Sequence, residues 1–206
     1  MAFLISTICI SLSFAYADPV HREYDWDNQE EFMPLSAKDS SEPELILKDF
    51  LSYEYNYDEE GDFTRYVFRH KAILVNSDES IERNNRIYLP LGQDKDIFRQ
   101  EARVVRPDGT IIEMNEENIK EAIDESTDRI YKYFALDGLV KGSIVEYLYL
   151  VNTSPTIAGS RVILQDEYPS KESTFEIISP KHLVVGTKSY NGFSDLTEDT
   201  SYYDRT

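Results

Sequence analysis

The alternation of side chains between Phe63 and Val75 constrains the fold more than any other feature of the sequence. Tyr66, Phe68, Ala72 and Leu74 fall on one face of this segment, and Arg65, Arg69 and Lys71 fall on the other. Successive side chains of a β-strand point to opposite faces, so a period of two predicts a strand with one buried face. Any fold proposed for the chain has to pair this strand with others.

A partner strand is predicted immediately upstream. Between Phe50 and Tyr57 three tyrosines, Tyr53, Tyr55 and Tyr57, alternate with polar residues, and the polar run 58–62 supplies a turn. The two segments therefore predict a β-hairpin. Together with Tyr66, the tyrosine stripe has two interpretations. It is either half of a sandwich core, which is the commoner use of such a pattern, or an exposed platform for sugar rings or a partner.

The remaining strand signals recur roughly every ten residues, with turn residues between them. Further strands are predicted at Arg86–Leu91, Ile97–Arg106, Thr110–Met114, Arg129–Leu136, Ser143–Val151, Arg161–Glu167, Ser173–Ile178 and His182–Tyr190. The chain has 25 Tyr and Phe residues but only 8 Gly and 8 Pro, a balance that suits sheets. We therefore predict an all-β fold of sandwich-like antiparallel sheets with at most one or two short helices.

Two helical segments are predicted within this β-rich pattern. Ser41 and Glu44 have capping-box spacing around Pro43, which predicts a single helical turn over residues 45–48. Residues 115–125 predict a short helix, because two isoleucines lie four residues apart and two glutamates occupy the first turn.

The first 17 residues are uncharged and carry an apolar stretch too short for a membrane span. Ala15 and Ala17 form an A-x-A cleavage site, so residues 1–17 predict a secretory signal peptide and a mature chain that begins at Asp18. No Lys or Arg follows Met1, so either the start of the signal relies on the charged amino terminus alone or the first residue is assigned wrongly. A buried N-terminal strand or helix is the alternative to a signal peptide. Cys9 is the single cysteine and lies in this segment. The mature chain would then hold neither a disulfide nor a thiolate nucleophile, and packing would have to stabilise it.

The domain organisation that we expect has three parts after the signal peptide. Residues 18–41 predict an extended acidic arm or linker, residues 42–190 the β-sandwich domain, and residues 191–206 a tail or the start of a linker to a further C-terminal domain. The chain carries 39 Asp and Glu against 21 Lys and Arg, a formal net charge of -18. A surface of that sign repels a phosphate backbone, which excludes general nucleic-acid binding.

Two motifs carry a family resemblance. The first is Ala102-Arg103-Val104-Val105-Arg106-Pro107-Asp108-Gly109-Thr110, where Pro107 and Gly109 suit a turn between strands. The second runs from Phe134-Ala135-Leu136-Asp137-Gly138-Leu139 through Lys141-Gly142-Ser143-Ile144-Val145-Glu146-Tyr147 to Tyr149. In this order and spacing, and with Leu164-Gln165-Asp166 and Tyr168-Pro169 further on, residues 63–190 resemble the DUF3857 domain.

The resemblance implies a β-rich module of exported bacterial proteins that precedes a transglutaminase-like, papain-like catalytic domain with Cys, His and Asp. Because the sequence ends at Thr206, no residue here matches that triad, and the chain is expected to be a fragment or a separate copy of the accessory module. Gly138 and Gly142 are interpreted as turn glycines at the entrance of a strand. A phosphate-binding loop is the weaker alternative, since no helix with Lys-Ser or Lys-Thr follows them.

The sequence singles out no catalytic, cofactor-binding or metal-ligating residue. His21, His70 and His182 lack zinc-ligand spacing, and His70, between Arg69 and Lys71, is interpreted as a surface or edge residue. Gly142-Ser143 leads into a strand rather than a nucleophile elbow. The acidic runs 25–28 and 58–62 could hold Ca²⁺, although a solvated acidic surface is the commoner explanation.

We therefore expect a non-catalytic accessory module that is exported to the periplasm or the cell exterior. Its partner would be a downstream transglutaminase-like domain or another exported protein, and no nucleic acid, cofactor or integral membrane segment of the mature chain is expected. The alternative is a self-sufficient carbohydrate- or peptide-binding β-sandwich that uses an aromatic surface patch.

Overall fold

The structure is a computed structural model that describes residues 18–27, 32, 35–58, 60–90, 97–124, 129–156 and 158–199. The predicted signal peptide, with Cys9, lies outside the described residues. Among the residues described, the helices are too short and too polar to cross a bilayer. Residues 191–199 form neither a helix nor a strand.

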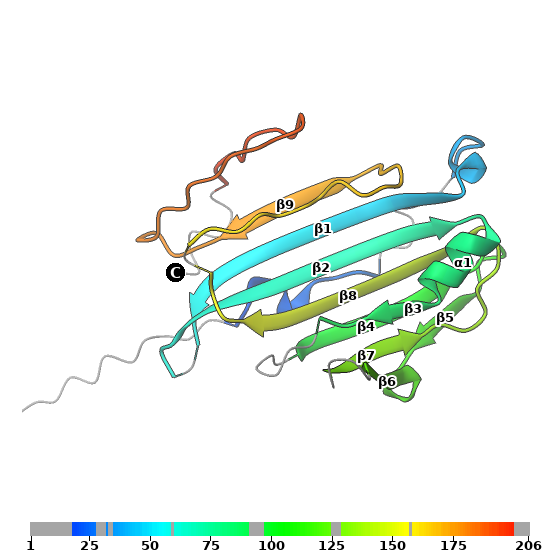
Figure 1. Cartoon of the computed structure of the whole chain (residues 1–206), viewed down its shortest axis with the longest axis horizontal. Coiled ribbons are helices and arrows are strands. Elements are labelled where there is room, and N and C mark those ends of the chain that lie inside the picture. The colour runs from blue at the N-terminus through cyan, green and yellow to red at the C-terminus, as the bar shows by residue number, and fades with distance from the viewer. Residues whose placement is uncertain are drawn as a thin grey trace, which may run out of the picture.

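Two β-sheets build the molecule (Figure 1). The larger sheet has the strand order β5-β4-β8-β2-β1-β9, and the smaller has the order β3-β7-β6. The strands are β1 (Glu44–Tyr57), β2 (Phe63–Val75), β3 (Arg86–Tyr88), β4 (Ile97–Val105), β5 (Ile111–Met114), β6 (Ile119–Asp124), β7 (Arg129–Ala135), β8 (Ser143–Thr153) and β9 (Ser173–Ile178). β9 pairs with β1 in parallel, and the other strand pairs are antiparallel. The predicted all-β, sandwich-like class is confirmed.

The predicted hairpin is the centre of the larger sheet. β1 and β2 pair from Tyr57 opposite Phe63 to Glu44 opposite Val75. The turn between them closes where the Gly61 N–H donates to the Asp58 carbonyl at 3.0 Å, and Gly61 has a φ of +86°. A glycine suits this position, because left-handed backbone is unfavourable for residues with a Cβ.

Both predicted helices are wrong. Residues 45–48 belong to β1, where Leu45 and Leu47 are buried and the pairing with β2 outweighs the local capping signal. The other predicted helix, 115–125, is replaced over its described residues by a 3₁₀ turn (Glu116–Asn118) followed by β6, and residue 125 lies outside the described residues. The four-residue spacing of Ile119 and Ile123 misled the prediction, since residues i and i+4 share a face in a strand as well as in a helix.

Other departures are smaller. The helix α1 (Asp78–Asn84) was not predicted; it starts at Ser77, whose side chain accepts from the Ser80 N–H at 3.0 Å. A capping box usually has Glu or Gln three residues after the N-cap. Ser80 occupies that position here, so the sequence pattern did not reveal the capping box. The predicted strands Arg161–Glu167 and His182–Tyr190 are also wrong, because both segments lack strand pairing.

The larger sheet buries apolar side chains on both faces. On the front, towards the viewer in Figure 1, the smaller sheet packs over one end. The cluster between the sheets contains Ile73, Val75, Ile87, Leu89, Ala102, Val104, Met114, Phe134, Leu136 and Val145. The back face carries two further clusters, one around Leu45, Leu74 and Ile144 and the other around Tyr66, Phe68 and Leu148.

The N-terminal residues cover the back face. They pass behind the sheet as the blue segment of Figure 1 and include a 3₁₀ turn, Val20–Glu23. Trp26 is 6% exposed and packs in the cluster around Phe68, while Phe32 packs in the cluster around Leu45. The segment that the sequence presents as a polar arm therefore contributes apolar side chains to the core.

Candidate functional site

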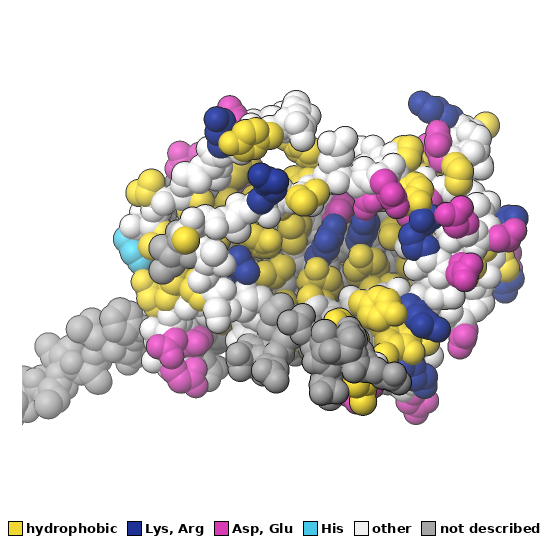
Figure 2. All heavy atoms as spheres, in the orientation of Figure 1, with side chains coloured by type: hydrophobic (Ala, Val, Ile, Leu, Met, Phe, Trp, Pro, Cys, Tyr) yellow, Lys and Arg dark blue, Asp and Glu magenta, His cyan; other side chains and the backbone are white. Residues whose placement is uncertain are grey.

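A groove runs along the front face of the larger sheet where the smaller sheet does not cover it. Figure 2 shows the hollow, with dark-blue basic and yellow hydrophobic side chains on its floor. Two cross-strand rows of the sheet form that floor, because residues directly opposite one another share a face. The rows are Leu51, Arg69 and Tyr149, and Asp49, Lys71 and Tyr147.

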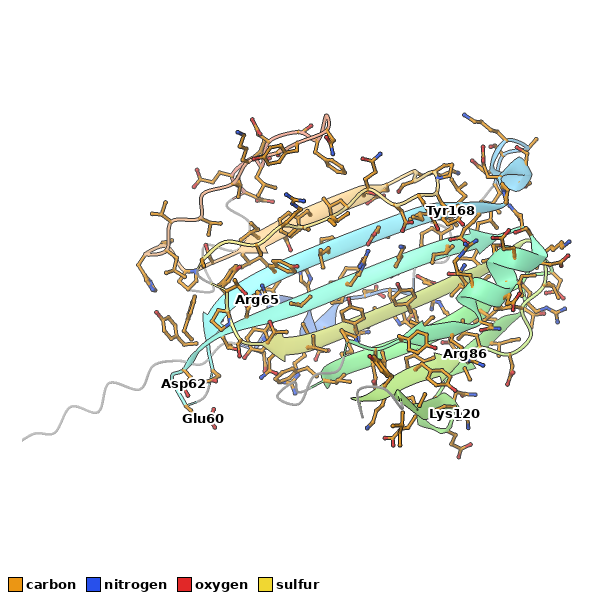
Figure 3. The ribbon with its side chains drawn as sticks, viewed as in Figure 1. Glu60, Asp62, Arg65, Arg86, Lys120 and Tyr168 are labelled. Carbon is orange, nitrogen blue, oxygen red and sulfur yellow. The ribbon has the colours of Figure 1, made fainter. Side chains whose placement is uncertain are left out.

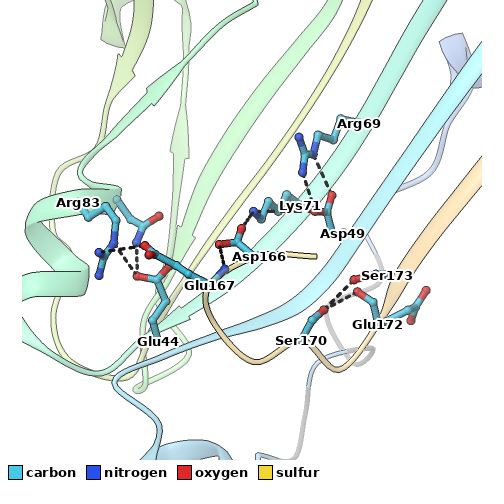
Figure 4. A network of polar contacts seen from close by, with 11 residues as sticks. Glu44, Asp49, Arg69, Lys71, Arg83, Asp166, Glu167, Ser170, Glu172 and Ser173 are labelled. Atoms are coloured by element: carbon cyan, nitrogen blue, oxygen red, sulfur yellow. Dashed lines mark hydrogen bonds and ion pairs between the residues drawn. The ribbon is translucent and has the colours of Figure 1, made fainter. Parts of the chain in front are cut away.

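Ion pairs hold the basic side chains of the floor (Figure 4). Arg69 donates from Nε to Asp49 Oδ1 at 2.8 Å and from Nη2 to Asp49 Oδ2 at 2.6 Å. Lys71 Nζ donates to Asp166 Oδ2 at 3.0 Å. Burial raises the pKa of Asp166, but the hydrogen bond and positive charge of Lys71 outweigh it and hold that pKa below its usual value. The alternation of the sequence predicts that Arg69 and Lys71 lie on the face of the strand opposite the buried one. That face is not fully open to solvent, because Lys71 is only 8% exposed.

Tyr147 and Tyr149 stand beside these pairs. Burial raises the pKa of each phenol to about 12, and the nearby Arg69 charge opposes that rise only in part. Both phenols therefore keep their protons at neutral pH. They can donate hydrogen bonds to a ligand but cannot act as bases there.

One end of the groove deepens into an open pocket of about 240 Å³. Strands β1, β2 and β8 contribute residues to its lining, together with the consecutive elements α1 and β3 and the segment that precedes β9. Arg83 on α1 lies 3.2 Å from Glu44, measured from Nε to Oε2, and its guanidinium lies 4.5 Å from the centre of the Tyr168 ring. Figure 3 shows Tyr168 and Arg86 on opposite sides of this end.

The other end of the groove is aromatic. The Arg65 guanidinium lies 4.8 Å from the centre of the Tyr53 ring, and its Nε donates to Thr153 Oγ1 at 3.0 Å. Tyr57, at the end of β1, is 41% exposed. The core interpretation of the tyrosine stripe is thus wrong for Tyr57. Tyr66 does lie in the core, on the back face, because the register places it opposite Glu54 rather than beside Tyr53.

A second cluster of ionisable groups lies on the back face and is sealed from solvent. His70 Nε2 is 2.7 Å from Glu146 Oε1, and Arg103 Nε donates to Glu146 Oε2 at 2.6 Å. These three side chains are at most 2% exposed. The N-terminal arm closes the cluster, since the Trp26 ring centre lies 3.9 Å from the Arg103 guanidinium and the Tyr24 hydroxyl lies 3.1 Å from His70 Nδ1.

This sealed cluster corrects the prediction for His70. The residue lies on a central strand rather than at a surface or an edge, and its neighbours in sequence, Arg69 and Lys71, point to the opposite face. A substrate could reach neither His70 nor Glu146 without removal of the arm. The geometry therefore indicates a structural role for the pair.

The remaining histidines have other polar partners. His21 Nε2 is 2.8 Å from Glu176 Oε2, which also accepts from Ser52 Oγ at 2.8 Å. Burial raises the pKa of Glu176, but these two hydrogen bonds outweigh it, and the pKa lies below its usual value. His182 stacks on Tyr57 with ring centres 6.0 Å apart. In the part of the chain that the structure describes, no group of three or more His, Cys, Asp or Glu side chains is arranged to hold a metal ion.

The two sequence motifs meet in space, which sequence spacing alone could not reveal. Arg103 of the first motif pairs with Glu146 of the second across β4 and β8. Gly142 has a φ of +85°, and a Cβ there would lie 3.0 Å from Pro107 Cγ. Ser143 is fully buried at the start of β8, where its Oγ accepts from the Val140 N–H at 3.0 Å. These contacts agree with the turn-glycine interpretation and give Ser143 a structural partner.

Comparison with known proteins identifies a family and shows structural similarity to solved proteins. The model of the family described as a domain of unknown function with solved structure, DUF3857, matches residues 61–205, which is most of the chain. A crystal structure of a candidate protease from Parabacteroides distasonis is similar with a TM-score of 0.54 and 14% sequence identity. That match covers 68% of this chain and 29% of the other, so this chain corresponds to less than a third of that protein. No curated protein matches the chain.

Proposed function

The chain belongs to the DUF3857 family, and from this premise we propose that it is a non-catalytic interaction module of an exported transglutaminase-like protein. In this proposal the front groove packs against the catalytic domain or presents substrate to it. The similar crystal structure belongs to a longer chain of which this fold makes up less than a third, so such a fold can form one part of a larger protein.

The groove is the observation that carries the proposal. It exposes part of a sheet face that the smaller sheet covers elsewhere, and its floor mixes apolar, aromatic and paired charged side chains. Such a surface can bury apolar area on a partner without leaving the charges of Arg69 and Lys71 unpaired, since both already have carboxylate partners.

The described side chains favour binding over catalysis in this groove. Tyr147 and Tyr149 remain protonated at neutral pH, and Lys71 is held by Asp166. The one close pair of a histidine and a carboxylate on the sheet centre, His70 and Glu146, is buried on the other face. A module of this kind would contribute affinity and position, while the reacting groups would belong to its partner.

A separately produced transglutaminase-like domain of this family provides the test. We expect it to bind the chain in an analytical ultracentrifuge and to protect amides of β1, β2 and β8 from hydrogen exchange. The variant Val67→Asp places a charge on the half-buried groove floor between Tyr53 and Val151 and should abolish the complex. Ile123→Asp makes the same change at a side chain that is 65% exposed on β6 and should leave the complex intact.

Either of two results would contradict the accessory role. The first is the absence of any complex with the wild-type chain. The second is a complex of unchanged affinity with Val67→Asp, provided that the variant keeps the wild-type circular dichroism spectrum.

The aromatic end of the groove favours a second candidate, a glycan-binding module. Tyr57 is 41% exposed and lies 5.5 Å from Phe63 between ring centres, so a sugar ring could stack there. Isothermal titration with cello- and chito-oligosaccharides tests this candidate. Binding should be lost in Tyr57→Ala and kept in Tyr190→Ala, a control at another exposed tyrosine, 66% exposed. Heats indistinguishable from dilution would remove the candidate.

A further inference from the structure

We infer that the groove takes an extended acidic segment of the partner polypeptide, with Arg65 at one end and Arg86 at the other binding its carboxylates. This inference rests on the proposed function and names the chemistry of the occupant. It follows from how the basic side chains around the groove are partnered.

Three of these basic side chains are already neutralised. Arg69 pairs with Asp49, Lys71 with Asp166, and Arg83 with Glu44. These pairs fix the floor and the pocket wall, and their charges are unavailable to a ligand unless an existing ion pair breaks.

Arg65 and Arg86 differ from the other three. Within the described part of the chain neither forms an ion pair with a carboxylate. Each guanidinium instead lies over a tyrosine ring, that of Arg65 at 4.8 Å from the centre of Tyr53 and that of Arg86 at 5.5 Å from the centre of Tyr133. A stacked guanidinium is held in place while N–H donors at its edge stay open to a carboxylate. Arg86 lines the pocket at the end of the groove. Its side chain lies with Tyr133 on the outer face of the smaller sheet, because Ile87 beside it points into the core, so Arg86 stands at the rim of the groove rather than on its floor.

Their positions suit an extended segment. Arg65 lies near one end of β2, and Figure 3 shows it at the opposite end of the groove from Arg86 and Tyr168. From Arg65 to Lys71 the strand advances about 20 Å at roughly 3.3 Å per residue, so a segment of about six to eight residues would follow the floor. Val67 and Leu51, between the ends, offer apolar contacts to its side chains.

The net charge of -18 does not prevent this match. Repulsion between the acidic surface and an acidic segment acts over distance, and at about 0.15 M salt it is screened beyond roughly 8 Å. Direct contacts between carboxylates and stacked arginines inside a half-buried groove are screened much less. Binding should therefore be measured at this ionic strength rather than at low salt.

The test uses fluorescein-labelled octapeptides that alternate valine with glutamate, serine or lysine. Fluorescence anisotropy at pH 7 should show the glutamate peptide binding at least tenfold more tightly than the other two. The double variant Arg65→Gln/Arg86→Gln should weaken that binding about tenfold, or roughly threefold for each arginine. Arg22→Gln is the matched control, because Arg22 lies on the N-terminal arm behind the sheet and pairs with Asp18. It should leave the affinity unchanged.

The inference would be overturned by equal binding of the three peptides, or by a double variant with wild-type affinity for the glutamate peptide. Tighter binding of trigalacturonate than of the glutamate peptide would overturn it in favour of an acidic glycan. A transglutaminase-like domain that binds the wild-type chain and the double variant equally would also overturn it, while the accessory role would stand. Failure of that domain to bind at all is the separate result that removes the accessory role.

Discussion

Arg103 and Glu146 form an ion pair that has lost nearly all contact with water. Each side chain is at most 2% exposed, and Glu146 also lies 2.7 Å from His70, measured from Oε1 to Nε2. Removing two charges from water carries a large desolvation penalty, which only good geometry and further hydrogen bonds can offset. Disrupting the pair would leave the buried Arg103 guanidinium with only the exposed carboxylates of Asp27 and Glu113 to balance its charge.

Glu146→Gln tests this directly. The substitution keeps the size of the side chain but removes the buried carboxylate that pairs with Arg103 at 2.6 Å. Arg103 then keeps only the more distant and solvent-exposed carboxylates of Asp27, at 3.3 Å, and Glu113, at 3.8 Å, so we expect the free energy of unfolding to fall by about 3–5 kcal/mol. Urea denaturation followed by circular dichroism measures the loss. Glu79→Gln removes one member of a solvent-exposed pair with Arg83 and should change stability by less than about 1 kcal/mol. A similar small effect of both substitutions would mean that water reaches Arg103.

Gly142 shows a different residue-scale constraint, one of backbone shape. Its φ of +85° disfavours any residue with a Cβ, and a Cβ would also lie 3.0 Å from the rigid ring of Pro107. We expect Gly142→Ala to lower the free energy of unfolding by about 2 kcal/mol. Gly192→Ala shares the positive φ, +83°, but its Cβ would meet open space, so about 1 kcal/mol is expected. Equal losses in thermal unfolding would show that the contact with Pro107 is relieved without strain.

The sequence predicts the structural roles of some of these residues and not of others. The turn at Pro107 and Gly109 was predictable, because each residue has a backbone preference that acts within four residues. The pairing of Arg103 with Glu146 was not, since it depends on the register between β4 and β8, strands far apart in sequence. Arg65, Arg69 and Lys71 were visible as a charged stripe on β2, but nothing local to β2 reveals that a second sheet forms a wall beside them.

At the scale of elements, the strands were predicted better than the segments that cover them. β2, β4, β5, β7, β8 and β9 each fall within one or two residues of the prediction, because alternation is a local signal of a half-buried sheet. The N-terminal arm has no such period. Its contribution to the core comes from isolated aromatic residues, Tyr24 and Trp26, whose burial only the folded sheet defines.

The arm makes a testable contribution to stability. Trp26 covers Arg103 with its ring and packs against the cluster that includes Phe68. Trp26→Ala should lower the free energy of unfolding by about 3–5 kcal/mol, because the variant loses the apolar packing of the ring and its cation–π contact with Arg103. Guanidinium denaturation measures the change, with Tyr190→Ala, at a side chain that is 66% exposed, as the control. A loss below about 1 kcal/mol would show that the arm rests on the sheet without stabilising it.

The ion pair between Asp39 and Lys171 links two further segments of the chain, and the titration of Asp39 reports on it. Asp39 joins the 3₁₀ turn Asp39–Ser41 to the segment before β9, and the hydrogen bond from Lys171 Nζ at 2.6 Å, with those from Ser36, lowers its pKa to about 2. A carboxyl group whose folded pKa is lowered stabilises the fold above its ordinary pKa of 3.8, and this stabilisation is lost as the pH falls towards 2.

Lys171→Gln should therefore raise the pKa of Asp39 from about 2 towards 3.8, while the Ser36 hydrogen bonds keep it somewhat below that value. Carboxyl ¹³C chemical shifts followed against pH measure the change. Lys141→Gln removes a comparable exposed partner, that of Asp78, and should leave Asp39 unaltered. A pKa for Asp39 that stays near 2 in Lys171→Gln would assign the whole shift to Ser36.

For the whole molecule the dominant electrostatic fact is the excess of 39 acidic over 21 basic residues. Like charges spread over a compact domain repel one another, and folding brings them closer than they are in the unfolded chain. The buried pairs described above resist screening, whereas the repulsion between exposed carboxylates does not. Salt should therefore remove more repulsion than attraction.

Raising NaCl from about 0.01 M to about 0.15 M shortens the Debye length from roughly 30 Å to roughly 8 Å. We expect the melting temperature at pH 7 to rise by about 3 °C, which corresponds to roughly 1 kcal/mol for a domain of this size. Differential scanning calorimetry measures the shift, and equal ionic strengths of NaCl and KCl should give the same value if screening is the cause. A fall in melting temperature with salt would mean that exposed ion pairs outweigh the net repulsion. The net charge of -18 would then not destabilise the fold measurably. Screening of that charge by salt could then no longer explain how an acidic partner binds at the groove.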